Sequence, residues 1–279
     1  MSNPKIKKDY RLIWFQHLHK AAGTSIVRLA FNNGENLYPQ HGNGNPFSSD
    51  GRLIPLWNLD AYGLKRFVDH CQEMGITFVA TEYGAPNFKY LSDDTRVTLI
   101  TCLRNPYDRF VSDFRFSYYR GDTDKSTPER YLNSSTLSSM DNYYCRIFSQ
   151  HCKKHMLIED RHYQLAKRSL KLFNYCIVLE EPEPLKKLSR FLGWEGKELH
   201  ENRNKIDCIT ILRQIAKGKP QPIVRRLLHK RNKSDQGFME FFNRTNYWDF
   251  KIYREWYQLS ASGKNRAADF KYDLGSCIN

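Results

Sequence analysis

Two short polar segments of the sequence carry side chains that could hold anions. The first, HKAAGTS at residues 19–25, places Lys20 in a small-residue loop directly before a helical pattern that starts at Thr24. Backbone N–H groups at a helix start, together with the positive end of the helix dipole, bind phosphate oxygens, and a lysine adds a mobile positive charge. The segment also fits a plain strand-to-helix turn built on Gly23 with Thr24 as the cap, so it needs a second element to define a site.

The second segment, RNPYDRFVS at residues 104–112, follows the apolar run 97–103. Arg104 stands at the tip of that predicted strand, and Asn105-Pro106 is typical of a helix start. Ser112 then lies about two turns along the helix, so a guanidinium group and a hydroxyl could bind one terminal phosphate. The alternative is an Arg104 paired with Asp108 and a serine on an exposed helix face.

The elements around these segments predict how the segments are positioned. Apolar runs at 10–18, 76–81, 97–103 and 175–180 indicate strands, and helical spacing follows or separates them at 24 onward, 59–74, 138–153, 160–173 and 183–192. Alternating strands and helices predict an α/β fold with a central parallel sheet flanked by helices, and ligands bind beyond the carboxyl ends of such strands. Residues 33–55 predict an irregular insertion, and 235–259 predict a helical C-terminal part that packs across the sheet edge.

Taken together, the two segments resemble the sulfotransferases that use 3′-phosphoadenosine 5′-phosphosulfate (PAPS), the PAPS-dependent sulfotransferases. Residues 17–25 are similar to the 5′-phosphosulfate-binding loop of that family (typically HxPKTxGTS), and RNPYDRFVS is similar to its 3′-phosphate motif (typically RdPxxRxxS). His19 replaces the usual proline, and Ala21 the usual threonine. The chain is most similar to the heparan sulfate 2-O/6-O-sulfotransferase-like group over residues 10–258, through DNYY at 141–144, the run 173–194, HENRNK at 200–205, and NYWD at 246–249 with Tyr253.

The resemblance implies a P-loop-like sulfotransferase fold and a set of donor-binding residues. With 279 residues we expect one domain over 1–279, with 1–9 flexible and 260–279 a tail. The resemblance implies that PAPS binds through its 5′-phosphosulfate and its 3′-phosphate, and that residues near 200–205 cover the adenosine. The residues implied are Lys20, Ala22, Gly23, Thr24 and Ser25 for the 5′-phosphosulfate, and Arg104 and Ser112 for the 3′-phosphate.

The implied reaction moves the sulfuryl group of PAPS in line to a hydroxyl or amine of a carbohydrate or small-molecule acceptor. The other product is adenosine 3′,5′-bisphosphate (PAP). Lys20 is suited to stabilise the charge on the leaving phosphate, and the sequence has no pattern of metal ligands, so we expect no metal. Glu82 ends the strand 76–81 at the same sheet edge and is the candidate general base. Burial would raise its pKa and contact with Lys20 would oppose this. The alternatives are a Glu82 that only orients Lys20 or caps a helix, and a base supplied by His17 or His19.

Composition and charge limit the remaining function classes. Lys and Arg number 44 against 30 Asp and Glu, a net charge of +14 that favours phosphorylated or sulfated ligands. Seven basic residues and no acidic one lie in 217–233, which keeps a nucleic-acid-binding protein as one alternative. The sequence contains no nucleic-acid-binding motif, so we expect no such partner. A non-catalytic binder of adenosine 3′,5′-bisphosphate is the other alternative.

The expected compartment follows from apolar runs and cysteines. We expect a cytoplasmic protein without a membrane partner, because no run of about 18 apolar residues occurs. The seven scattered cysteines, never spaced as CxxC, are interpreted as reduced packing residues. Sequons at Asn133, Asn232 and Asn243 leave a trimmed Golgi lumenal domain as the alternative.

Overall fold

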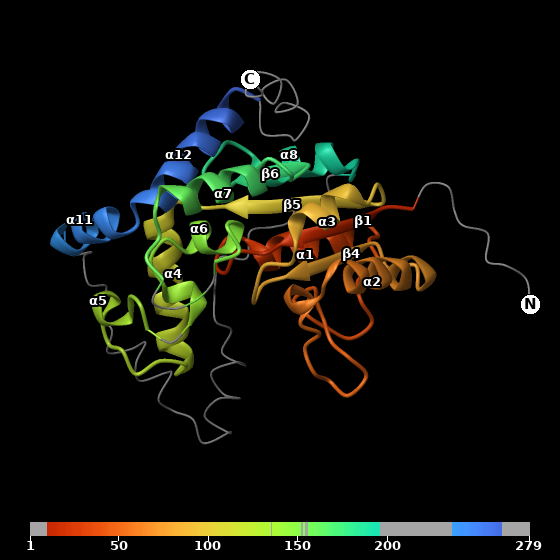
Figure 1. Cartoon of the computed structure of the whole chain (residues 1–279), viewed down its shortest axis with the longest axis horizontal. Coiled ribbons are helices and arrows are strands. Elements are labelled where there is room, and N and C mark those ends of the chain that lie inside the picture. Colours follow the sequence, from red (N-terminus) through yellow and green to blue (C-terminus); the bar gives the residue numbers. More distant parts are fainter. Residues whose placement is uncertain (1–9, 135, 152, 154–155, 196–235, 264–279) are drawn as a thin grey trace, which may run out of the picture.

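The computed structural model describes residues 10–134, 136–151, 153, 156–195 and 236–263, and its centre is a four-stranded parallel sheet (Figure 1). The strands are β1 (Leu12–Gln16), β4 (Phe78–Thr81), β5 (Val97–Leu103) and β6 (Tyr175–Val178), in the order β4-β1-β5-β6. Nearly every strand residue is buried, because helices cover both faces, and this explains the unbroken apolar runs of the sequence. The predicted parallel α/β sheet is confirmed.

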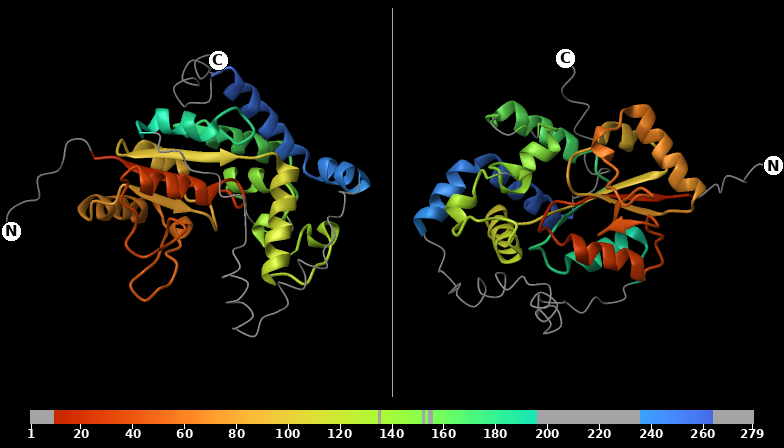
Figure 2. Two further views of the ribbon diagram at one scale, coloured as in Figure 1. Left: turned by 180° about the vertical axis from the view of Figure 1, so that it is seen from behind. Right: turned by 90° about the horizontal axis from the view of Figure 1, so that it is seen from below.

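Helices cover the two faces of the sheet in opposite groups. Figure 2 shows α1 (Gly23–Asn32) and α8 (Pro184–Leu192) on one face, and α2 (Ala61–Glu73) and α3 (Phe88–Asp93) on the other. The short 3₁₀ turn η1 (Leu56–Asn58) leads into α2, and α7 (Asp160–Leu170) precedes β6. Each helix returns the chain to the amino ends of the strands, so the polar loops that follow the strands gather at the opposite edge.

Two predicted helices are each divided in the structure by an asparagine. The helix predicted over 138–153 consists of the 3₁₀ turn η2 (Leu137–Ser139) and α6 (Tyr143–Phe148), because Asn142 between them has a left-handed backbone with φ 48°. The helix predicted over 235–259 is divided at Asn246 into α11 (Gln236–Thr245) and α12 (Tyr247–Ala261). Helix α12 contacts the edge strand β6, which confirms the predicted helical cover of the sheet edge (Figure 1).

The insertion 33–55 contains a short antiparallel ladder and holds the end of β4. Its strands are β2 (His41–Gly42) and β3 (Asn45–Pro46). The backbone N–H of Ala80 donates to the Gly44 carbonyl at 2.9 Å, and the N–H of Glu82 donates to Asn45 Oδ1 at 2.9 Å. The insertion therefore fixes the backbone on which Glu82 is carried.

Helix α4 (Pro106–Arg120) extends from the carboxyl end of β5 and forms a second apolar cluster with α5 (Pro128–Tyr131) and α11. Cys71, Cys102, Cys145 and Cys176 are buried free thiols, as expected of packing residues. Cys152, Cys208, Cys277 and the terminal segments 1–9 and 264–279 lie outside the described residues. Within the described ranges, no helix combines the length and apolar character needed to cross a membrane.

Candidate functional site

The strand order reverses between β1 and β5, and the two segments expected to bind anions, 19–25 and 104–112, follow β1 and β5 at this point. We call them the anion-binding segments. From β1 the chain passes to β4 on one side of the sheet, and from β5 it passes to β6 on the other. Crevices at such a reversal are where open parallel sheets bind ligands. Arg104, after β5, donates through Nη1 to the carbonyl oxygen of Lys20, after β1, at 3.2 Å. The fold therefore brings the two segments into direct contact at one sheet edge.

The loop between β1 and α1 has a strained backbone that leaves N–H groups open. Lys20 (φ 66°) and Ala22 (φ 58°) have left-handed conformations that non-glycine residues rarely adopt. Ala22, and not Thr24, is the N-cap, and no side chain of the described residues caps the helix. The first N–H groups of α1, which include those of Gly23, Thr24 and Ser25, have no acceptor within the helix. This is the arrangement that favours a bound anion.

Gly23 is required by the close approach of a histidine ring. A Cβ atom placed on Gly23 would lie 1.8 Å from Nε2 of His17, which is itself buried. The imidazole therefore occupies the space that any other side chain at residue 23 would need. The glycine of the loop serves packing against His17 as well as the backbone path into α1.

We expect Gly23→Ala to destabilise the protein by about 1–3 kcal/mol, because the added methyl group overpacks the site against His17. Urea unfolding of the variant measures the loss. The double variant His17→Ala/Gly23→Ala removes the clash, so Gly23→Ala should cost markedly less free energy in the His17→Ala background. Equal losses in both backgrounds would contradict the packing account.

The Lys20 ammonium lies within a small basic and aromatic group. Its Nζ is 4.1 Å from the ring centroid of Phe116, and the Arg120 guanidinium lies 4.9 Å from the same centroid. Burial is the main reason why the pKa of Lys20 is below its ordinary value, and the nearby carboxylate of Asp113 opposes that shift. An anion bound beside Lys20 would favour the charged ammonium.

Glu82 is held between two histidines and does not form an ion pair with Lys20 among the described residues. Its Oε1 lies 2.6 Å from His19 Nδ1, and its Oε2 lies 3.4 Å from His17 Nδ1 without the geometry of a hydrogen bond. Burial alone would raise the pKa of Glu82, but the two histidines lower it well below the ordinary value. The carboxylate is therefore ionised at neutral pH, and the histidines, rather than Lys20, set its pKa.

His19 also contacts a carboxylate that the sequence-based assignment omitted. Its Nε2 lies 3.1 Å from Oδ1 of Asp113, a residue of α4 whose side chain is 1% exposed. Burial would lower the pKa of His19, but the contacts with Asp113 and Glu82 raise it to about 9. His19 is therefore a half-buried cation between two carboxylates at neutral pH.

Helix α4 begins as the sequence predicts. The side chain of Asn105 accepts hydrogen bonds from the N–H groups of Tyr107 (3.0 Å) and Asp108 (3.3 Å), and Pro106 occupies the first turn. Among the described residues Arg104 forms no ion pair with Asp108, which disfavours the structural alternative for that arginine. Ser112 lies half-buried on α4, two turns from the helix start.

The C-terminal helices support the site through α6. Tyr143 Oη accepts a hydrogen bond from the His19 N–H at 3.2 Å, and Tyr144 Oη donates to the Arg104 carbonyl at 2.7 Å. Asp249 of α12 accepts from the N–H groups of Tyr144 and Cys145, each at 2.9 Å. The start of α6 is therefore tied to both anion-binding segments and to α12.

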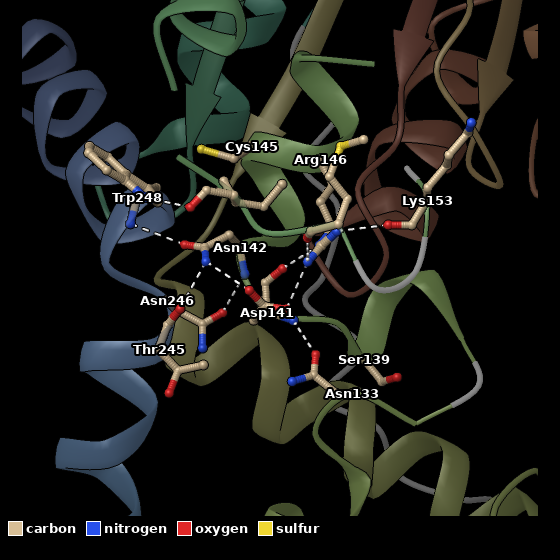
Figure 3. Close-up of polar contacts among 12 residues, drawn as sticks. Asn133, Ser139, Asp141, Asn142, Cys145, Arg146, Lys153, Thr245, Asn246 and Trp248 are labelled. Atoms are coloured by element: carbon tan, nitrogen blue, oxygen red, sulfur yellow. Dashed lines mark hydrogen bonds and ion pairs between the residues drawn. The ribbon is translucent and has the colours of Figure 1, made fainter. Parts of the chain in front are cut away.

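Figure 3 shows the junction that keeps α6 in this place. Asn246 Oδ1 accepts from the N–H of Asn142 at 2.8 Å, Asn142 Nδ2 donates to the Thr245 carbonyl at 2.8 Å, and the N–H of Trp248 donates to Asn142 Oδ1 at 3.1 Å. Arg146 adds an ion pair to Asp141 at 2.9 Å. These bonds explain why each predicted helix is interrupted at an asparagine.

Sequence reasoning missed Asp113, Phe116 and the roles of Tyr143 and Tyr144. Asp113 could have been noticed, because it lies between Phe110, Phe114 and Ser117 on the buried face of α4, where a carboxylate needs a partner. The contacts of Phe116 and of the tyrosines depend on segments far apart in the chain, so no local pattern indicates them.

Two predicted features and one class of site remain to be placed. The polar segment 200–205, expected over the adenosine, and the basic stretch 217–233 lie outside the described residues. Within the described part of the chain, no group of three or more His, Cys, Asp or Glu side chains is placed to hold a metal ion.

A scan against protein-family models found no family that matches the chain, and a search of curated proteins found no significant match.

Proposed function

We propose that the chain is a PAPS-dependent sulfotransferase with a P-loop-like sulfotransferase fold. The observation that carries the proposal is the contact between the two anion-binding segments at the point where the strand order reverses. Arg104 donates to the backbone of Lys20 at 3.2 Å, so the cations of the two segments belong to one site. A nucleotide with a 5′-phosphosulfate and a separate 3′-phosphate presents anions to both segments.

The residues present fit such a donor. The uncapped first turn of α1 offers the N–H groups of residues 23–25, and Lys20 adds a cation at the same loop. Arg104, with the hydroxyl of Ser112 further along α4, would hold the 3′-phosphate. PAPS supplies a sulfuryl group on a good leaving phosphate, and Lys20 would stabilise the negative charge that grows on that phosphate.

Glu82 is the proposed base for the acceptor. Its carboxylate is ionised at neutral pH, which is the form that can accept a proton from a hydroxyl or amine. His19 is a less suitable base, because both of its ring nitrogens already face carboxylates. His17 remains the alternative, since its Nδ1 has no hydrogen-bond partner among the described residues. The acceptor would be a carbohydrate or a small metabolite, and the loops 33–55 and 121–136 would shape its cleft.

Calorimetry with PAP tests the nucleotide site. Sulfuryl transfer is tested by incubating the protein with labelled PAPS and a set of acceptors, which are glycans and hydroxylated or amino metabolites. We expect PAP to bind more tightly than adenosine 5′-phosphate and a sulfated product to form with one acceptor class. Tight PAP binding without product across the acceptors would favour the non-catalytic binder. RNA that binds without competition from PAP would favour the nucleic-acid alternative. A folded protein that takes up no PAP would overturn the proposal. The compartment proposed for the enzyme is the cytoplasm.

Arg104→Ala should weaken PAP binding by about 10- to 100-fold, since a charge-assisted hydrogen bond to phosphate contributes about 1.5–3 kcal/mol. The affinity for adenosine 5′-phosphate should change little, because that ligand lacks the 3′-phosphate. Calorimetry with both nucleotides measures the difference. The matched control is Arg115→Ala, which removes an exposed arginine of the same helix. Equal losses for both nucleotides would remove Arg104 from the 3′-phosphate site.

A further inference from the structure

Asp113 links the helix of the second anion-binding segment to the loop of the first. It directly follows Ser112 on α4, and its Oδ1 lies 3.1 Å from His19 Nε2. The other ring nitrogen of His19 lies 2.6 Å from Glu82 Oε1. One imidazole thus joins a carboxylate of α4 to the carboxylate that follows β4.

The two nearby carboxylates favour the protonated form of His19. Its Nδ1 forms a hydrogen bond with Glu82 Oε1 at 2.6 Å, and its Nε2 lies 3.1 Å from Asp113 Oδ1, within ion-pair distance but without the geometry of a hydrogen bond. Two negative charges this close to one imidazole stabilise the imidazolium. Burial opposes the charge, but the two carboxylates outweigh it and raise the pKa of His19 to about 9. Other charged or titratable groups also face this cluster: Lys20 and His17 from the β1 side, Arg104 after β5, Arg109 and Arg120 from α4, and Tyr143 from α6.

We propose that Asp113 is a positioning residue that fixes His19 as a second cation next to Lys20 in the donor-binding loop. The carboxylate acts through the imidazolium and needs no contact with a ligand. In the proposed sulfotransferase, which this inference extends, His19 would strengthen the electrostatic stabilisation of the leaving phosphate. The charge state of His19 itself can be tested without any nucleotide.

The test is an NMR pH titration of the full chain labelled with ¹⁵N-histidine. The His19 signals are assigned by their loss in His19→Gln, since the sequence contains 9 histidines. In the wild type we expect His19 to remain protonated at both nitrogens at pH 7 and to titrate near pH 9. In Asp113→Asn the midpoint should fall by at least about one pH unit, a tenfold rise in the acid dissociation constant. A wild-type midpoint near the ordinary value of about 6.5, or an unchanged midpoint in Asp113→Asn, would overturn the proposal.

Tyr131→Phe is the matched control, because it removes the hydrogen bond that Tyr131 Oη donates to Asp113 Oδ2 at 3.2 Å and leaves the Asp113 charge in place. The control should leave the His19 midpoint unchanged, and a fall as large as that of Asp113→Asn would contradict a specific effect of the Asp113 charge. Circular dichroism checks that each variant is folded. If Asp113→Asn is unfolded, a wild-type midpoint near the ordinary value of about 6.5 would still overturn the proposal.

PAP affinity provides the functional readout. In the wild type PAP affinity should fall as the pH rises through about 9, and in Asp113→Asn this fall should move to lower pH together with the His19 midpoint. Affinity that follows pH identically in both proteins would reject the link to the donor. A wild type that binds no PAP but shows the raised His19 midpoint would reject the proposed function and leave the role of Asp113 intact.

Discussion

Glu82→Gln should lower turnover by about 10²–10⁴-fold, the range attributed to general base catalysis, while PAP binding stays nearly unchanged. Glutamine keeps the size of the side chain and the backbone bond from the Glu82 N–H to Asn45 Oδ1. It removes the ionised oxygen that would accept the acceptor's proton. Steady-state turnover of labelled PAPS and calorimetry with PAP measure the two effects separately. Retained turnover would remove Glu82 from the role of base.

The pH profile distinguishes a Glu82 base from a His17 base. With the pKa of Glu82 lowered by its histidine neighbours, turnover should stay level from pH 8 down to pH 5. A histidine base acts only as the neutral imidazole, so its protonation would instead lower activity about tenfold for each pH unit within the assayed range. A steep decline between pH 8 and pH 5 in the wild type, with His17→Asn inactive, would assign the base to His17.

The same lowered pKa affects stability. A carboxylate with a depressed pKa in the folded state stabilises the fold above its unfolded value of about 4.3, and this contribution is lost as the pH falls below that value. The interactions of Glu82 with His17 and His19 are therefore present over the whole range in which turnover is measured. Titration of Glu82 itself therefore causes no loss of stability between pH 8 and pH 5.

Lys20→Met should lower turnover by about 10²–10³-fold, as is typical when one group that stabilises transition-state charge is removed. Methionine retains an apolar stem against Phe116, whose ring centroid lies 4.1 Å from Lys20 Nζ, so the loop should keep its packing. The missing charge is one that would act on the leaving phosphate. Single-turnover rates with PAPS measure the effect.

Lys65→Met is the matched control for Lys20. Lys65 is an exposed lysine of α2 that pairs with Asp69 at 2.9 Å, away from both anion-binding segments. Its loss should leave turnover within about twofold and stability within about 0.5 kcal/mol, as for most surface substitutions. If Lys20→Met and Lys65→Met have the same turnover, Lys20 does not act on the donor.

The sequence by itself determined the sheet and the placement of the two anion-binding segments. The apolar run 97–103 is β5 in the structure, and Asn105 caps α4 as the pattern predicts. These features follow from local periodicity and from short capping bonds within one segment. The placement of Arg104 and Lys20 at one sheet edge also follows, because parallel strands place their following loops at the same edge. Their direct contact is a finding of the structure.

Only the tertiary structure decided the charges at that edge. The sequence left open whether Lys20 or burial controls the pKa of Glu82. In the structure, His17 and His19 lie against the carboxylate instead. The role of Asp113 likewise depends on α4 packing against the loop that carries His19. A pKa depends on the distances between charges and on their burial, and neighbours from distant segments set both. Local pattern therefore located the candidate site, and long-range packing determined its protonation.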